Sequence, residues 1–80
     1  MLDPKPTDIL LLSGKTQKGK NRIREWGERW ITIGPVVNRV LFPNPGIGPW
    51  IMIRSTRDGD GLSSRWLALG QDVDFSVEIQ

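Results

Sequence analysis

Closely spaced turn-forming residues are the feature that most constrains the fold of this chain. Nine glycines and six prolines are spread over 80 residues, and no uninterrupted apolar run is longer than the four residues found at 9–12. Proline lacks a backbone N–H group, and glycine reaches the positive φ values that tight turns need. We therefore expect short strands joined by turns.

Six segments have the composition of short strands. They are rich in β-branched and aromatic residues, and several alternate apolar with polar side chains. The predicted strands are residues 8–13, 29–33, 36–42, 50–55, 62–69 and 73–79. Glycine, proline and aspartate separate them at 43–49, 57–61 and 70–72, and residues 14–20 are expected to form a polar loop. The last strand has the clearest period of two.

This pattern predicts an all-β domain, specifically a small antiparallel and partly open barrel of about five or six strands. Its size would be that of SH3-like or OB-like barrels. Residues 1–7, which include Pro4 and Pro6, are expected to form an extended N-terminal arm, and residues 8–80 a single domain. Because such a small domain buries only about 60% of its surface, we expect its four tryptophans to supply a dense core.

Two structures are compatible with residues 21–30. Ile23, Trp26 and Trp30 are spaced so that they would share one face of a helix, but Gly27 would interrupt that helix. The alternative is a hairpin in which residues 21–26 form one strand, Gly27 and Glu28 turn the chain, and residues 29–33 form the next. We favour the hairpin and retain the helix as the alternative.

The absence of cysteine and histidine excludes several kinds of chemistry. Disulfides, thiolate zinc sites, cysteine nucleophiles and imidazole acid–base catalysis all require one of these residues. Asp58 begins a segment that resembles part of a calcium loop, but Leu69 stands where that loop needs a glutamate ligand. The remaining residues form no recognisable catalytic constellation. We therefore expect a protein that is not an enzyme and has no cofactor and no metal site.

A basic segment between residues 15 and 29 suggests a function. It holds six cations against the two acids Glu25 and Glu28, although the net charge of the whole chain is only +2. Exposed cations bind phosphate backbones without reading sequence, and a neighbouring aromatic ring can stack on bases. We predict a non-catalytic module that binds single-stranded or non-specific nucleic acid. The predicted binding residues are Lys15, Lys18, Lys20, Arg22, Arg24, Arg29 and Trp26.

A second hypothesis is a protein–protein interaction or self-assembling accessory module with no nucleic-acid role. Phe42 and Ile47 are large apolar residues in a proline-rich segment and are candidate interface residues. The strand at 73–79 is a candidate edge for pairing in a homodimer. Neither a leader peptide nor a membrane span is recognisable, so we expect a cytoplasmic protein with no membrane partner.

Overall fold

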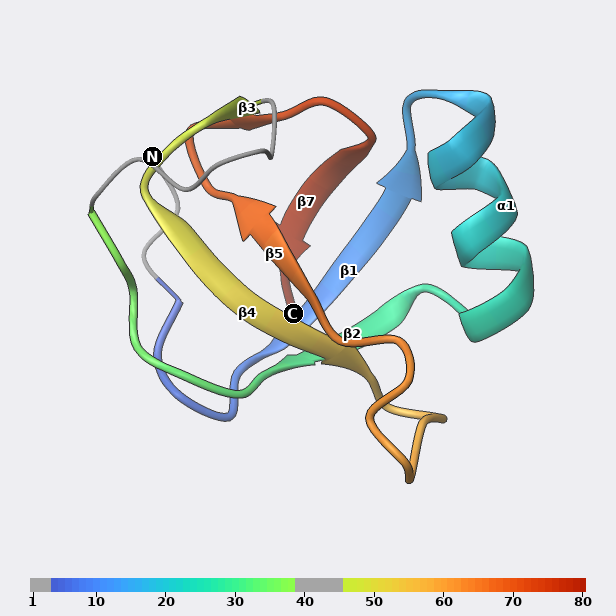
Figure 1. Cartoon of the computed structure of the whole chain (residues 1–80), viewed down its shortest axis with the longest axis horizontal. Helices are drawn as coiled ribbons and strands as arrows, with labels where there is room; N and C mark the ends of the chain where they lie inside the picture. The colour runs from blue at the N-terminus through green and yellow to red at the C-terminus, as the bar shows by residue number, and fades with distance from the viewer. Residues whose placement is uncertain (1–3, 39–45) are drawn as a thin grey trace.

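In the computed structural model, which describes residues 4–38 and 46–80, an antiparallel sheet of five strands curls into a half-barrel (Figure 1). The order across this sheet is β5-β4-β2-β1-β7, and β3 and β6 form a separate two-stranded ribbon. The elements along the chain are β1 (Ile9–Gly14), α1 (Gln17–Trp26), β2 (Arg29–Thr32), β3 (Gly46–Ile47), β4 (Trp50–Ser55), β5 (Arg65–Ala68), β6 (Gln71–Asp72) and β7 (Phe75–Ile79). The prediction of a β-rich, partly open antiparallel barrel is confirmed.

The core lies on the concave side of the half-barrel. Alternate residues of each strand point inward, as the period of two requires. The buried cluster comprises Leu10, Leu12, Trp30, Ile51, Ile53, Leu67, Leu69 and Phe75. The Trp30 and Phe75 rings lie 6.4 Å apart between centroids, so aromatic packing joins β2 to β7 across the interior.

The helix α1 corrects the prediction for residues 14–30. The hairpin favoured for residues 21–30 is wrong, and the loop expected at 14–20 ends at Thr16, whose side chain caps the helix by accepting the N–H of Gly19. Gly19 is buried, and Ile23 and Trp26 pack against the core. Gly27, with φ of +87°, ends the helix. The helical alternative therefore holds, except that Trp30 lies in β2.

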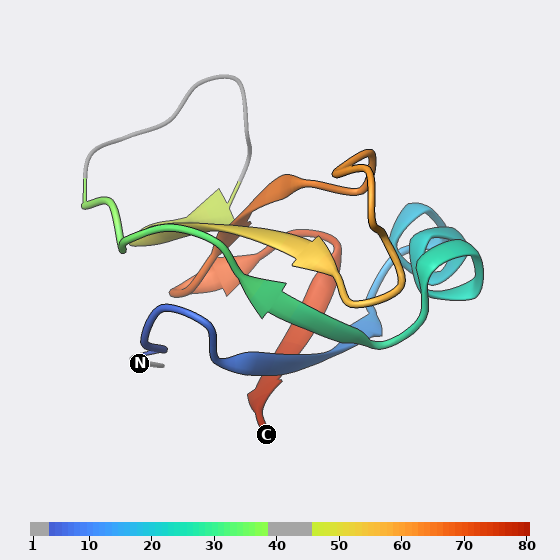
Figure 2. The same ribbon diagram turned by 90° about the horizontal axis from the view of Figure 1, so that it is seen from below.

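Seen from below, α1 lies at one end of the half-barrel, near the connection between β4 and β5 (Figure 2). There Ile23 and Trp26 of α1 pack against the core cluster. Within the described ranges, no helix has the length and apolar character needed to cross a membrane.

Three predicted boundaries shift in the structure. The strand expected at 62–69 begins only at Arg65, because Leu62 is exposed and Ser63 is drawn into the preceding turn by Asp58. The segment 70–72, expected as a turn, contributes β6, and the last strand begins at Phe75 instead of residue 73. The turn predicted at 57–61 is present, with Gly61 at φ of +77°.

The remaining segments lie partly outside the described residues. Of the strand predicted at 36–42, residues 36–38 are described and contain a single bridge, between Val37 and Trp50. The described end of the predicted 43–49 loop contains β3, which passes close to the Trp50 ring. Within the predicted arm, Pro4 is buried, and a turn follows in which Lys5 and Thr7 bond to Thr32 of β2.

Candidate nucleic-acid interface

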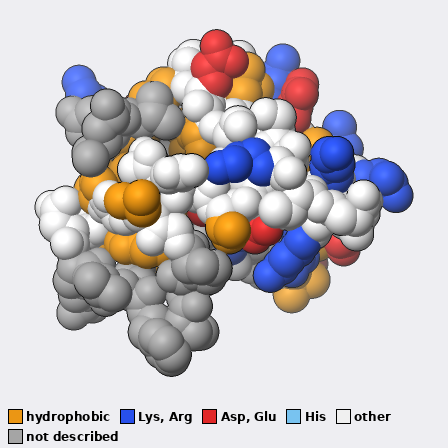
Figure 3. All heavy atoms as spheres, turned by 90° about the horizontal axis from the view of Figure 1, so that it is seen from above, with side chains coloured by type: hydrophobic (Ala, Val, Ile, Leu, Met, Phe, Trp, Pro, Cys, Tyr) orange, Lys and Arg blue, Asp and Glu red, His pale blue; other side chains and the backbone are white. Residues whose placement is uncertain are grey.

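The six cations predicted to bind nucleic acid are all exposed. Lys15 lies between β1 and α1, four others lie on α1, and Arg29 begins β2. Lysine and arginine side chains gather over the end of the molecule that carries α1 (Figure 3). Among residues 4–38 and 46–80, both ion pairs with carboxylates belong to Arg65. The exposed cations of α1 therefore lack a carboxylate partner in the described structure.

The helix arranges its four cations in two rows. Lys18 and Arg22 are four residues apart and lie one above the other on one flank, and Lys20 and Arg24 form the same arrangement on the other flank. Like charges at this spacing destabilise a helix by about 0.2–0.5 kcal/mol per pair. The first turn also carries no acidic residue. A bound polyanion would relieve this repulsion.

Lys15 differs from the other cations because its side chain already donates a hydrogen bond within the protein. Its Nζ donates to the backbone oxygen of Asp72 at 2.8 Å, and its backbone N–H donates to that of Asp74 at 2.7 Å. Lys15 therefore ties the start of α1 to the end of β6, and only its remaining N–H groups are free for a ligand.

Trp26 is held mainly by the core. Its ring is half-buried, packs against the core cluster, and carries a buried Nε1 that has no hydrogen-bond partner in the part of the chain that is described. The backbone oxygen of Trp26 accepts a bond of 2.5 Å from Ser55 Oγ. Contact with a base would have to use the exposed part of the ring.

The fold also brings Arg57 to this end of the molecule. Arg57 follows β4, and together with Trp26, Glu28, Arg29 and Thr56 it lines a cavity of about 290 Å³. Sequence reasoning missed Arg57 because it lies in a different segment from the basic one. The antiparallel pairing of β2 with β4 places the two segments side by side.

Asp58 organises the connection that follows Arg57. Its carboxylate accepts the Ser63 hydroxyl at 2.6 Å and the Asp60 N–H at 3.1 Å. The Ser63 hydroxyl is the largest cause that lowers the pKa of Asp58 from 3.8 to about 2, whereas burial acts in the opposite direction. The carboxylate thus stabilises a turn, and the described residues hold no cluster of three or more acidic side chains suited to a metal ion.

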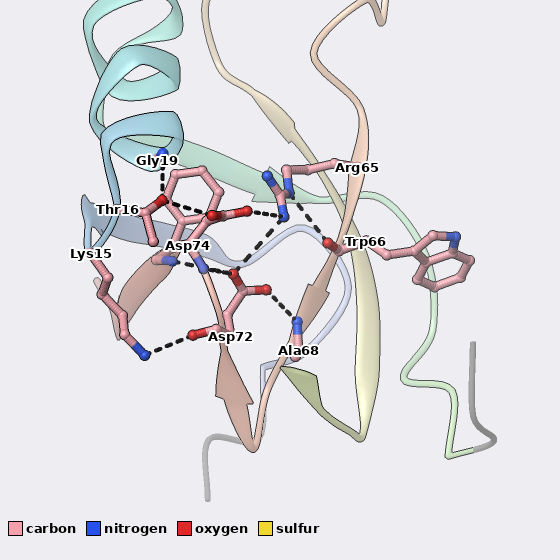
Figure 4. Close-up of polar contacts among 9 residues, drawn as sticks. Lys15, Thr16, Gly19, Arg65, Trp66, Ala68, Asp72 and Asp74 are labelled. Atoms are coloured by element: carbon pink, nitrogen blue, oxygen red, sulfur yellow. Dashed lines mark hydrogen bonds and ion pairs between the residues drawn. The ribbon is translucent and has the colours of Figure 1, made fainter. Parts of the chain in front are cut away.

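A buried polar network closes the open side of the half-barrel (Figure 4). The Asp72 carboxylate accepts the N–H of Ala68, at the end of β5, at 3.0 Å and the N–H of Phe75, at the start of β7, at 3.2 Å. One side chain therefore joins the two edge strands where direct strand pairing is absent in the described sheet.

Arg65, whose side chain is partly exposed, offsets part of the negative charge of this network. Its guanidinium lies 3.9 Å from Asp72 Oδ1 and 3.7 Å from Asp74 Oδ2, and 4.6 Å above the centroid of the Phe75 ring. Asp74 also accepts the Thr16 hydroxyl at 2.7 Å. Because these two acids face Arg65 and Thr16, they do not form ion pairs with the cations of α1.

The two predicted interface residues are placed differently. Ile47 lies on β3 with 61% of its surface exposed, and Phe42 lies outside the described residues.

The cations that the structure leaves exposed at the α1 end form what we call the basic surface. It consists of Lys18, Lys20, Arg22, Arg24, Arg29 and Arg57.

Comparison of the chain with protein-family models, with curated proteins and with solved structures gives no match.

Proposed function

We propose that this protein is a non-catalytic module that holds a nucleic-acid backbone on its basic surface. The observation that carries the proposal is the gathering of six exposed cations at one end of the molecule, without a carboxylate ion pair in the described ranges. Each cation that neutralises a phosphate releases condensed counterions, which gives affinity without base recognition.

The distribution of charge favours a linear polyanion over a single small anion. The ten residues of α1 span about 15 Å, and their cations are spread over both flanks and most of that length. Nucleic acid offers phosphates at regular short intervals along such a distance. Contacts of lysine and arginine side chains with phosphates carry no sequence information, so we expect little sequence preference.

Fluorescence anisotropy with labelled single-stranded and duplex oligonucleotides tests the proposal. We expect the logarithm of the association constant to fall linearly with the logarithm of the salt concentration. Absence of binding at about 50 mM salt, or binding that does not respond to salt, would contradict it.

Lys18→Glu is the sharpest variant for this test. It places an acid in the first turn of α1, where negative charge stabilises a helix, so lost binding cannot be attributed to lost folding. We expect the affinity to fall by about tenfold, or ~1.4 kcal/mol. Lys5→Glu is the matched control because it makes the same charge change at an exposed residue of the N-terminal segment, which lies on the opposite side of the molecule from α1 (Figure 1).

A second candidate function is self-association through β7, for which the edge hydrogen bonds supply a specific observation. Gln80 donates its backbone N–H to the backbone oxygen of Ile9, and Lys15 donates its own to that of Asp74. The backbone N–H and C=O groups of the even-numbered residues of β7 therefore point toward β1. The alternation of an antiparallel pair then directs the backbone groups of Val77 and Ile79 away from β1. Such an edge is a template for another strand.

A second copy of β7 fits this edge about a two-fold axis at Val77. That register pairs Val77 with its own copy and places Glu78 opposite Ser76, so no like charges face each other directly. Light scattering should then detect a dimer. Val77→Pro, which removes the outward N–H, should yield monomer, whereas Val77→Thr, which keeps that N–H, should not. A wild-type monomer at high concentration would contradict self-association.

A further inference from the structure

The cavity between the end of α1 and the start of the β4–β5 connection has the character of an anion site. It measures about 290 Å³ and is lined by Trp26, Glu28, Arg29, Thr56 and Arg57. We infer that this cavity coordinates a single phosphate group between Arg29 and Arg57. The inference rests on the proposed function in one respect, because it identifies where one phosphate of a bound strand is held.

Backbone hydrogen bonds fix the two sides of the cavity relative to each other. Thr56 donates its N–H to the backbone oxygen of Arg29 at 3.1 Å, which joins the residue after β4 to β2 between two residues that line the cavity. On the Arg29 side, the backbone oxygen of Glu28 accepts the N–H of Leu12 at 2.9 Å. The main chain at Arg29 is thus bonded to β1 on one side and to β4 on the other, and does not need to rearrange to receive a ligand.

The Ser55 hydroxyl holds the end of α1 in place beside Arg57. It donates to the backbone oxygen of Trp26 at 2.5 Å and accepts the backbone N–H of Arg57 at 3.1 Å. Ser55 is fully buried. One hydroxyl therefore holds the last residue of α1 against the residue that carries the second guanidinium.

Gly27 leaves room for the Arg57 side chain. A Cβ atom built on Gly27 would lie 3.1 Å from both Nε and Cζ of Arg57, which is tighter than ordinary van der Waals contact. The guanidinium therefore lies directly over the backbone at the end of α1. Since Gly27 also has φ of +87°, a larger residue there would be strained and would displace Arg57.

The chemistry of the lining suits a phosphate. Two guanidinium groups, each a planar fork of N–H donors, match phosphate oxygens in paired hydrogen bonds, and the Thr56 hydroxyl adds a further donor. Neither Arg29 nor Arg57 has an ion pair with a carboxylate in the described structure. Glu28 is the opposing charge, so the site keeps one net positive charge.

Titration with inorganic phosphate at constant ionic strength tests the site without any oligonucleotide. The readout is the indole N–H resonance of Trp26 in a nitrogen–proton NMR spectrum, identified by its disappearance in Trp26→Phe. We expect a saturable shift with a dissociation constant on the order of 1 mM, and none with chloride. No saturable shift up to about 50 mM phosphate would overturn the inference.

Three variants test whether the charged residues of the cavity determine its affinity for phosphate. Arg57→Gln and Arg29→Gln should each weaken phosphate binding by about tenfold, because each removes a charge-assisted pair of hydrogen bonds. Glu28→Gln should strengthen it by about threefold, because it removes the opposing charge. Lys5→Gln, far along the chain and outside the cavity, should leave it unchanged. Unchanged binding in both arginine variants would also overturn the inference.

Oligonucleotides with and without a 5′-phosphate separate the possible sources of the phosphate. Tighter binding of the phosphorylated strand, lost in Arg57→Gln, indicates a terminal phosphate, whereas equal binding that Arg57→Gln weakens indicates a backbone phosphodiester. Saturable binding of inorganic phosphate without oligonucleotide binding would uphold the site and contradict the proposed function. Salt-dependent oligonucleotide binding that neither arginine variant changes would uphold the function and overturn the site.

Discussion

The Thr16 hydroxyl donates a hydrogen bond of 2.7 Å to Asp74 Oδ1, so the residue that caps α1 is tied to the turn that precedes β7. The same oxygen accepts the N–H of Gly19 at 3.1 Å. The buried glycine brings the first turn of α1 close to Asp74, because a Cβ atom there would collide with the Asp74 backbone oxygen. The start of the helix and the open side of the half-barrel are therefore stabilised together.

Thr16→Ala should destabilise the protein by about 1–2 kcal/mol because it removes the cap of α1. It also leaves Asp74 without the hydroxyl donor. Urea denaturation followed by tryptophan fluorescence measures the change in the free energy of unfolding. Thr16→Ser keeps the hydroxyl and should recover most of the loss. Equal stability of the alanine variant and the wild type would show that the cap contributes nothing.

Asp72→Asn should destabilise the protein by about 2–3 kcal/mol, because a neutral amide has one oxygen where the carboxylate uses two. Asp72 Oδ1 accepts the backbone N–H groups of Asp74 and Phe75, and Oδ2 accepts that of Ala68. Chemical denaturation is the measurement. Asp60→Asn is the control, since Asp60 is exposed and its carboxylate forms no hydrogen bond with the described residues. A similar loss in both variants would refute the role of Asp72 in closing the half-barrel.

Stability should fall with acidification between about pH 4 and pH 2 through Asp58. The pKa of this carboxyl is lowered from 3.8 to about 2 in the folded protein, so the folded state binds its proton less readily than the unfolded state. The stabilisation is therefore complete above pH 3.8 and is lost as the pH falls through about 2. Thermal denaturation across this range measures the effect.

Asp58→Asn should flatten that dependence, because the group that titrates is gone. The variant should also be less stable at neutral pH, since Ser63 loses its carboxylate acceptor. Asp60→Asn again serves as the control and should retain the full slope. If Asp58→Asn and the wild type showed the same slope from pH 4 to pH 2, the assignment to Asp58 would be wrong.

Ser55→Ala should cost about 1–3 kcal/mol, because it leaves the partly buried backbone oxygen of Trp26 without its hydroxyl donor. It also frees Arg57 from the end of α1, so phosphate binding in the cavity should weaken although no guanidinium is removed. Denaturation and the phosphate titration measure the two effects separately. Ser64→Ala, at an exposed position, is the control for both.

Much of the half-barrel was predictable from local sequence. Turn residues and the alternation of apolar side chains predicted the strand at 50–55 at its observed bounds, and those at 8–13 and 29–33 to within one residue at each end. These patterns reflect local geometry, since a strand with one buried face must alternate. The strand predicted at 62–69 extended too far because the bond between Asp58 and Ser63 is a turn-specific contact that composition does not show.

The helix was less predictable, because local preferences opposed it. Gly19 lowers the helix propensity inside α1 and Gly27 lies directly after it, yet both are needed where they stand. Gly19 allows the close approach to Asp74, and Gly27 ends the helix and accommodates Arg57. The close approach to Asp74 and the space for Arg57 both depend on segments more than 29 residues away, which a local pattern does not contain. Tertiary packing therefore decided between the helix and the hairpin.

The amino-acid sequence by itself determined that this chain forms short antiparallel strands and carries exposed cations between residues 15 and 29, because turn chemistry and charge are local properties. Only the tertiary structure decided which cations share a surface. The pairing of β2 with β4 brings Arg57 to Arg29, and Lys15 donates a hydrogen bond from Nζ to the backbone oxygen of Asp72. Such contacts join residues distant in sequence, and they exist only once the sheet has formed.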